Sequence, residues 1–139
     1  MGIENETELS NIIYDISNGL KYIHANRIAH RDIKIENIVK GENGKWKICD
    51  FGSCTQKHYN QKLTQADVEN IGNSIEKVTT PLYRAPEQLD LLKGYKINQK
   101  VDVWALGCIM YTLMYHKPPF GNGSRLAITN GHYIVPKLP

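Results

Sequence analysis

Two short polar segments that lie close together in the chain most constrain what this sequence can fold into. The first is HRDIKIEN at residues 30–37, and the second is DFG at residues 50–52. Between them, apolar residues flank a Gly-Glu-Asn-Gly run at residues 41–44, which is typical of the turn of a β-hairpin. Such a hairpin would fix the distance between Asn37 and Asp50, so we expect these side chains to converge.

The side chains of these two segments suit the transfer of a phosphoryl group. In this reaction negative charge spreads over the phosphoryl oxygens, so metal ions must lie beside them and the incoming hydroxyl must be oriented. Asp32 could accept the hydroxyl proton, and Lys34 could neutralise the phosphoryl group. Asn37 and Asp50 offer the hard oxygen ligands that Mg²⁺ prefers. We therefore expect Asp32, Lys34 and Asn37 to be catalytic, Lys34, Asn37 and Asp50 to bind the cofactor, and Asn37 and Asp50 to hold the metal.

Two further motifs complete an order that is typical of one enzyme family. Ala85-Pro86-Glu87 and DVWALG at residues 102–107 follow the first two segments, and together the four motifs resemble eukaryotic protein kinases over nearly the whole chain. A His-Arg-Asp triplet alone would be compatible with ordinary surface charge, but four motifs in this order are not. The resemblance implies ATP and Mg²⁺ as cofactors, a protein substrate, and the C-terminal lobe of the kinase fold, mainly α with a small β-hairpin.

The same resemblance indicates the substrate class and two more site residues. Kinases that act on serine or threonine carry a lysine where Lys34 stands, whereas those that act on tyrosine usually carry alanine or arginine in this region. In Ser/Thr kinases a threonine at the position of Thr80 bridges the catalytic aspartate and lysine, so Thr80 is expected to be catalytic. The residue before Asp50 lines the floor of the nucleotide pocket in kinases, so Cys49 is expected to contact the cofactor.

A narrower resemblance concerns four runs between Cys49 and Pro136. Residues 53–55, 75–84, 104–108 and 119–121 are similar to the numb-associated kinases, which include the adaptor-associated and cyclin-G-associated kinases. Those enzymes phosphorylate clathrin-adaptor subunits on threonine. The resemblance therefore implies a clathrin-adaptor subunit as a possible protein partner.

The motifs also indicate how much of a kinase domain this sequence contains. Only residues 1–29 precede the first motif, and they contain neither a glycine-rich loop nor a strand lysine that would clamp ATP. The arginine that kinases pair with the glutamate of Ala-Pro-Glu is also missing, which leaves Glu87 without its expected partner. We expect residues 1–139 to be a partial domain without its N-terminal lobe, running from the helix before the catalytic loop, through an activation segment at about 50–87, to just past the central buried helix.

Two alternatives follow from that extent. The first is an active Ser/Thr kinase of which this chain is most of the C-terminal lobe, with the isolated piece expected to be inactive. The second is a noncatalytic scaffold or binding module built on the same lobe. The presence of Asp32, Lys34, Asn37 and Asp50 favours the first, because a scaffold has no physical need for all four.

Composition excludes several other classes of protein. The 22% charged and 41% hydrophobic residues are ordinary for a globular domain, and a dispersed net charge of +3 does not favour nucleic acid. The apolar runs are shorter than the roughly 18 residues of a transmembrane helix. Cys49, Cys54 and Cys108 lack metal-binding spacing, so we expect reduced thiols and a cytoplasmic location.

Periodicity and turn residues predict the elements that carry these motifs. Apolar residues at three- and four-residue steps predict a first helix, and an almost wholly apolar run predicts a buried central helix. The polar stretch at 53–78 is expected to be a long loop. The expected elements are a helix at 7–25, a turn and strand at 26–29, a hairpin with strands at 38–39 and 46–49, short helices at 66–71 and 88–92, the central helix at 101–115 and a helix at 124–129 capped by Ser124.

Several side chains around the motifs have expected roles of their own. His30 is expected to pack beneath the loop, and Asp102 to accept its backbone N–H groups. Arg31 could pair with a phosphate on the activation segment. The candidate acceptors, for which loop solvation is the simpler explanation, are Thr55, Thr64, Ser74 and Thr79.

Overall fold

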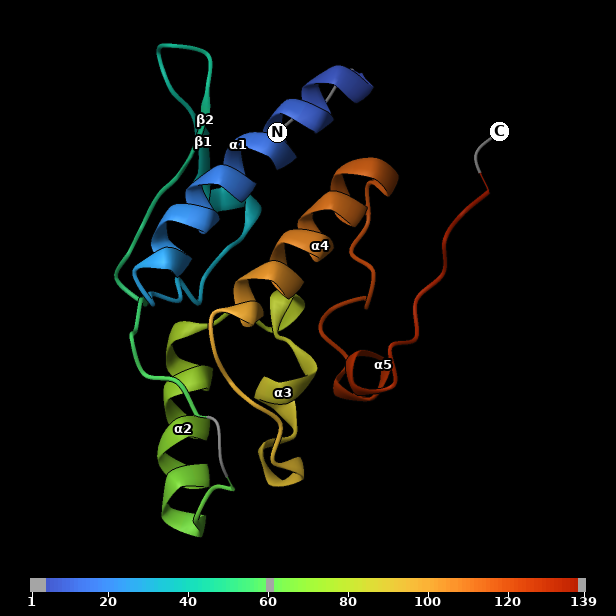
Figure 1. The fold of residues 1–139 in the computed structure, drawn as a ribbon. Helices are drawn as coiled ribbons and strands as arrows, with labels where there is room; N and C mark the ends of the chain where they lie inside the picture. Colours follow the sequence, from blue (N-terminus) through green and yellow to red (C-terminus); the bar gives the residue numbers. More distant parts are fainter. Residues whose placement is uncertain (1–4, 60–61, 138–139) are drawn as a thin grey trace.

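Two long helices lying side by side organise this structure, a computed structural model that describes residues 5–59 and 62–137. They are α1 (Glu6–Ala25) and α4 (Lys100–Tyr115), and a two-stranded antiparallel sheet of β1 (Ile38–Lys40) and β2 (Trp46–Ile48) packs against α1 (Figure 1). The shorter helices are α2 (Gln65–Val78), α3 (Pro86–Leu89) and α5 (Arg125–Thr129), with 3-10 turns η1 (Ile35–Asn37), η2 (Pro81–Tyr83) and η3 (Leu91–Lys93). The expected mainly α fold with one small hairpin is confirmed. Within the described ranges no helix is long and apolar enough to cross a membrane.

Helix α1 forms where its apolar stripe predicts a helix. Asn5 caps its start, because the side-chain oxygen accepts a hydrogen bond from the Glu8 backbone N–H at 2.9 Å. The buried residues of the helix repeat at steps of three or four, which places them on one face; they are Ile12, Ile16, Leu20 and Ile23. The predicted helix at 7–25 is therefore confirmed, with its start one residue earlier.

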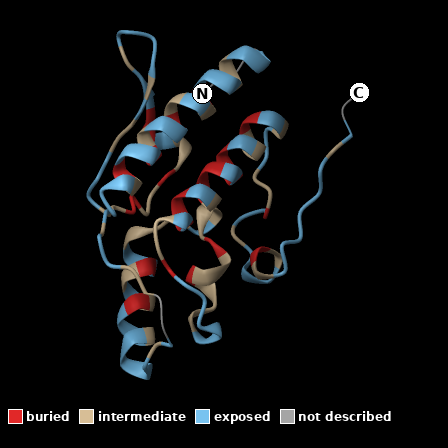
Figure 2. Cartoon of the chain, viewed as in Figure 1, coloured by how far each residue is buried: buried red, intermediate tan, exposed pale blue. Residues whose placement is uncertain are grey.

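The main core lies between α1 and α4, where the buried residues of the two helices face each other (Figure 2). From α4 it takes Ala105, Leu106, Ile109 and Leu113, and Ile33 and Ile38 close it beneath the catalytic loop and hairpin. The predicted central helix is present as α4, and seven of its residues are buried, but it is not buried on every side. Its opposite face carries Val103, Met110 and Met114, which are exposed and which no described element covers.

The predicted hairpin is confirmed, and a close approach to α1 fixes its position. Ile38 pairs with Ile48 across the two strands. A side chain at Gly19 of α1 would lie 3.1 Å from the Ile48 Cδ1 atom, so glycine lets the sheet pack close to the helix. The Trp46 backbone N–H donates to the Asp15 carboxylate at 3.0 Å, which adds a polar tie between strand and helix.

The loop expected at 53–78 contains a longer helix than predicted. Helix α2 occupies fourteen residues, whereas only 66–71 were expected to be helical. Thr64 and Asp67 form a capping box in which each side chain accepts the other's backbone N–H, at 3.1 and 3.0 Å. Ile71 and Ile75 are buried against the loop before α4, so two anchors hold a helix whose remaining surface is polar.

Smaller differences concern the ends of elements. The strand expected at 26–29 is reduced to a single bridge between Ala29 and Thr55. The helix expected at 88–92 is split into α3 and η3 and ends at Gly94, whose φ of +71° continues neither. The helix capped by Ser124 is confirmed as α5.

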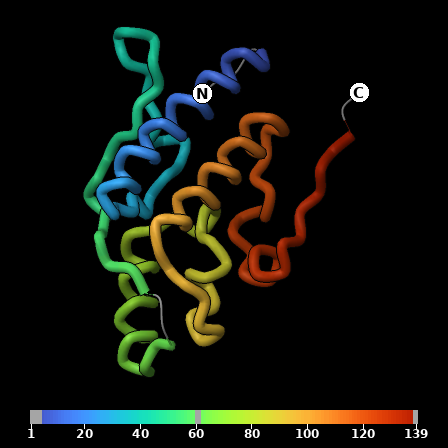
Figure 3. Tube along the Cα trace, in the orientation of Figure 1, coloured from blue at the N-terminus to red at the C-terminus, as the bar shows by residue number. Residues whose placement is uncertain are grey.

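The chain after α5 returns beside α4 (Figure 3). There the Tyr111 hydroxyl donates to the Ile134 carbonyl, and the Tyr133 ring packs edge-on against Tyr111 and Phe120. The loop between α4 and α5 approaches η2, where Gly123 lies close to the Pro81 backbone.

The capping box makes a prediction that can be measured by pH titration. The Thr64 backbone N–H, and to a smaller degree the Thr64 side chain, lower the pKa of Asp67. This stabilisation is therefore present above the ordinary pKa of an aspartate and is lost as the pH falls through the lowered value. We expect Thr64→Ala to raise the pKa of Asp67 only part of the way towards its ordinary value in an NMR titration, because the substitution removes the side-chain contribution and keeps the backbone N–H. Ser124→Ala, which removes the cap of α5, should leave it unchanged, and equal shifts in both variants would contradict the assignment.

Candidate active site

A buried carboxylate holds the first polar segment in place. Asp102, in the first turn of α4, is 1% exposed. Its two oxygens accept the backbone N–H groups of His30 at 2.8 Å and Arg31 at 2.9 Å, so its expected role is confirmed. A third donor is the His24 ring nitrogen Nε2, which lies 2.8 Å from Oδ2. The loop at 30–37 is thereby tied to both long helices.

His24 is a contributor that sequence reasoning missed. It lies in the last turn of α1, four residues after Leu20 of the buried stripe. That spacing places it on the helix face that points into the core, where a polar side chain needs a partner. The sequence could therefore have indicated that His24 needs a buried partner. That this partner is Asp102 becomes clear only from the fold.

His30 connects the two motifs. Its ring is fully buried, and Nδ1 accepts the Asp32 backbone N–H at 3.1 Å while Nε2 donates to the Cys49 carbonyl at 2.9 Å. The ring also packs edge-on against Phe51, with centroids 5.0 Å apart. One imidazole therefore sets the backbone at Asp32 relative to the backbone just before Asp50.

The backbone of the site adopts left-handed conformations at two residues other than glycine. Arg31 has φ of +72° and Asp50 has φ of +59°. Such residues are uncommon, and they persist where surrounding contacts fix them. Hydrogen bonds to the neighbours of both residues supply that constraint here.

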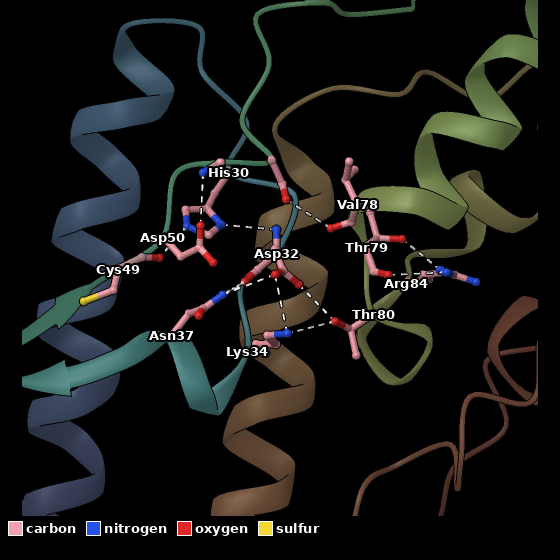
Figure 4. A network of polar contacts seen from close by, with 12 residues as sticks. His30, Asp32, Lys34, Asn37, Cys49, Asp50, Val78, Thr79, Thr80 and Arg84 are labelled. Atoms are coloured by element: carbon pink, nitrogen blue, oxygen red, sulfur yellow. Dashed lines mark hydrogen bonds and ion pairs between the residues drawn. The ribbon is translucent and has the colours of Figure 1, made fainter.

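Four of the predicted site residues meet at the carboxylate of Asp32 (Figure 4). Thr80 donates its hydroxyl to Oδ1 at 3.0 Å, and the Lys34 ammonium lies 3.5 Å from Oδ2. The Lys34 ammonium also donates to the Thr80 hydroxyl at 3.4 Å, so Asp32, Lys34 and Thr80 each contact the other two. Asn37 donates its amide N–H to the Asp32 carbonyl at 2.8 Å and to Oδ2 at 3.3 Å.

Asp50 reaches the same region by way of the hairpin. The Cys49 backbone N–H donates to the Asn37 carbonyl at 2.7 Å. This bond fixes the end of the segment at 30–37 against the start of the segment at 50–52. The Asp50 side chain is exposed and accepts the Gly52 N–H at 3.2 Å. Figure 4 shows the Asp50 carboxyl group on the side of the hairpin that faces Asp32. In the described part of the chain no hydrogen bond or ion pair joins these two side chains.

Cys49 is placed differently from the other predicted residues. Its carbonyl belongs to the His30 network, but its half-buried sulfur points away from Asp32 (Figure 4). The structure therefore does not bring the thiol together with the polar cluster.

The oxygens that remain available fit a hard cation. Asn37 uses its amide nitrogen for Asp32, which leaves its amide oxygen free to face a metal, and Asp50 uses one oxygen for Gly52. Amide and carboxylate oxygens are suited to Mg²⁺. Across residues 5–59 and 62–137 no three His, Cys, Asp or Glu side chains gather in one place.

Arg31 faces the activation segment. Its Nε donates to the Ser53 carbonyl at 2.6 Å and its Nη1 to the Ser74 hydroxyl at 3.1 Å, and burial lowers the pKa of its guanidinium. Ile71 and Gln88 line a cavity of about 200 Å³ beside it. Arg31 thus ties α2 to the catalytic loop.

The candidate phosphate acceptors already have structural hydrogen bonds. Thr64 caps α2, Ser74 accepts from Arg31, and Thr55 accepts the Lys57 backbone N–H at 3.1 Å. Thr79 accepts from the Arg84 guanidinium at 2.8 Å, which braces the turn that follows Thr80. Modification of any of them stays a prediction.

Glu87 has no ion-pair partner among the residues that the structure describes. It lies half-buried at the start of α3, and burial raises the pKa of its carboxyl group.

Comparisons with known proteins were made over the whole chain. Residues 2–135 match a family model described as the protein kinase domain. Two probable serine/threonine-protein kinases of Dictyostelium discoideum are 38% and 42% identical over 134 residues, covering 94% of this chain. Actin-regulating kinase 1 of Saccharomyces cerevisiae is 37% identical over 137 residues, covering 97% of it.

These relatives are much longer than the chain. The matches span 12% and 16% of the two Dictyostelium proteins and 21% of the yeast protein. Together with the family model they confirm the predicted resemblance to Ser/Thr protein kinases and the lobe fold. The narrower resemblance to numb-associated kinases stays a prediction.

The buried carboxylate leads to a stability prediction. Asp102→Ala should lower the free energy of unfolding by about 3–5 kcal/mol, because it removes a buried charge and leaves three donors without their acceptor. The control is Asp90→Ala, which breaks a more exposed pair with Lys93 at 3.5 Å and should cost less than about 1 kcal/mol. Urea unfolding measures both, and similar losses would show that Asp102 does not hold the loop.

Proposed function

Because this chain belongs to the protein kinase domain family, we propose that it carries the catalytic loop of an enzyme that transfers the γ-phosphate of ATP to serine or threonine side chains of proteins. The observation that carries the proposal is the Asp32 carboxylate, which Thr80, Lys34 and Asn37 all contact. A noncatalytic scaffold would not require three polar side chains to converge on one carboxylate.

Asp32 is the group we propose to orient the substrate hydroxyl and accept its proton. Its two oxygens are held from different sides, by Thr80 at Oδ1 and by Lys34 and Asn37 at Oδ2. A carboxylate fixed in this way can direct one lone pair towards an incoming hydroxyl without further rearrangement.

Lys34 and Thr80 are proposed to join this base to the substrate loop. The Lys34 ammonium lies within 3.5 Å of both the Thr80 hydroxyl and Asp32, so its positive charge stands where the transferred phosphoryl group would arrive. Thr80 directly precedes the turn η2, and its bond to Asp32 therefore links the base to the backbone that would present the substrate.

Asn37 and Asp50 are proposed to hold Mg²⁺ through the oxygens that their local hydrogen bonds leave available. When bound, Mg²⁺ neutralises charge on the phosphate oxygens of ATP. The contribution of the chain is to hold the two oxygen ligands at the two ends of one hairpin. Contact between Cys49 and the nucleotide rests on the family resemblance alone, as its sulfur points away from the cluster.

The protein substrate is proposed at a finer level from the four runs that are similar to numb-associated kinases. On that resemblance we propose a clathrin-adaptor subunit phosphorylated on threonine. Incubation of the full-length protein with ATP and a purified adaptor subunit, followed by phosphosite mapping, tests this. Phosphorylation of a generic threonine peptide but not of the adaptor would reject the substrate and retain the activity.

We expect isolated residues 1–139 to transfer negligible phosphate. Positioning of reactants supplies roughly 7–11 kcal/mol of barrier reduction, and this sequence lacks the glycine-rich loop and the strand lysine that would position ATP. Transfer of radiolabelled phosphate by the isolated chain that Asp50→Ala abolishes would contradict this expectation.

Two substitutions in the full-length protein separate the proposed roles of the acidic residues. Asp32→Asn should lower kcat by roughly 100-fold or more and spare nucleotide affinity, because it removes the proton acceptor but no metal ligand. Asp50→Ala should weaken binding of Mg-ATP itself. Steady-state kinetics and nucleotide titration measure these effects, and equal losses of nucleotide affinity in both variants would contradict the division of roles.

A further inference from the structure

The loop between α4 and α5 touches the substrate-side turn at a residue that has no side chain. Gly123 has φ of +93°, and a Cβ atom built on it would lie 2.9 Å from the Pro81 carbonyl carbon and 3.0 Å from its oxygen. Real Cβ atoms essentially never come within 3.0 Å of another heavy atom. Because the neighbour is backbone, no rotation of a side chain could relieve the contact.

Gly123 is held firmly where it meets Pro81. Phe120 is buried and stacks on Trp104 of α4, with ring centroids 5.5 Å apart. The Phe120 carbonyl accepts the backbone N–H groups of both Gly123 and Ser124 at 3.3 Å. Ser124 then caps α5, whose Ile128 is fully buried. The α4–α5 loop therefore resists displacement. A clash between a side chain at Gly123 and Pro81 would displace the turn η2 instead.

Pro81 adjoins the residue that contacts the proposed base. The Arg84 backbone N–H donates to the Pro81 carbonyl at 3.4 Å, and the Tyr83 N–H donates to the Thr80 carbonyl at 3.0 Å. These bonds form η2. Movement of the Pro81 peptide group would shift Thr80, whose hydroxyl lies 3.0 Å from Asp32.

We infer that Gly123 is a positioning residue for the substrate-binding turn: its missing side chain lets the Pro81 backbone lie against the α4–α5 loop and so places Thr80 at the Asp32 carboxylate. This inference rests on the proposed function for its effect on phosphate transfer. The contact itself does not depend on that function and is tested separately.

The chain offers a matched control in the same loop. Gly121 also has a left-handed φ, +61°, but a Cβ atom built on it meets nothing within 4 Å. Gly121→Ala therefore strains the local backbone without touching η2. Asparagine adopts left-handed conformations more readily than alanine does, so Gly123→Asn and Gly121→Asn form a second pair that introduces the Cβ atom with less strain.

The first measurement is amide hydrogen exchange in the full-length protein. Gly123→Ala and Gly123→Asn should accelerate exchange at the Tyr83 and Arg84 amides by about tenfold or more, because the bonds that close η2 are disturbed. The Gly121 variants should not. Equal acceleration in both sets, or none in either, would overturn the inference.

The second measurement is peptide phosphorylation by the same variants. Those at Gly123 should lower kcat/KM for a threonine peptide by roughly 10- to 100-fold and leave KM for ATP unchanged, while the Gly121 variants match wild type. Equal losses for peptide and ATP would indicate general destabilisation and overturn the inference. If wild-type protein phosphorylated no peptide, the proposed function would fail, and the exchange comparison would still decide whether Gly123 positions the turn.

Discussion

The carboxylate of Asp102 is the interaction on which the rest of this site depends. A buried charge is costly unless hydrogen bonds satisfy it, and three donors converge on it from the end of α1 and from the catalytic loop. Since Asp102 lies in the first turn of α4, the two long helices and the loop are fixed relative to one another. The His30 ring then hydrogen-bonds to the Cys49 carbonyl, which fixes the hairpin relative to the loop.

The hairpin brings the two polar motifs together. Cys49 donates to the Asn37 carbonyl at one end of the sheet, while the close packing of Ile48 against Gly19 holds the sheet on α1. The start of the first motif is therefore held by Asp102 of α4, and the start of the second follows a sheet that packs on α1. Asp32 and Asp50 need no direct bond to lie in one region, because the elements that carry them pack on one core.

Local signals in the sequence were sufficient for much of this fold. The stripe of α1, the turn at 41–44 and the Ser124 cap each act within a few residues, and the structure has these elements close to the expected boundaries. Helix α2 was underestimated because only Ile71 and Ile75 are buried, too few to give a sustained pattern. His24 and Gly123 escaped notice since their partners, Asp102 and Pro81, lie far away in the sequence.

The two halves of the site differ in how completely this chain orders them. On the substrate side, Asp32 has partners at both oxygens, and Thr80 lies in a turn packed against a firmly held loop. On the metal side, the Asp50 side chain is exposed and accepts one hydrogen bond, from Gly52. Ordering a free side chain on binding costs free energy, whereas a preorganised one avoids that cost. On the proposed assignment, the half that orients the hydroxyl is built into the lobe itself, and in the metal half Asn37 is already fixed by Asp32, which leaves Asp50 as the side chain that a cation would have to order.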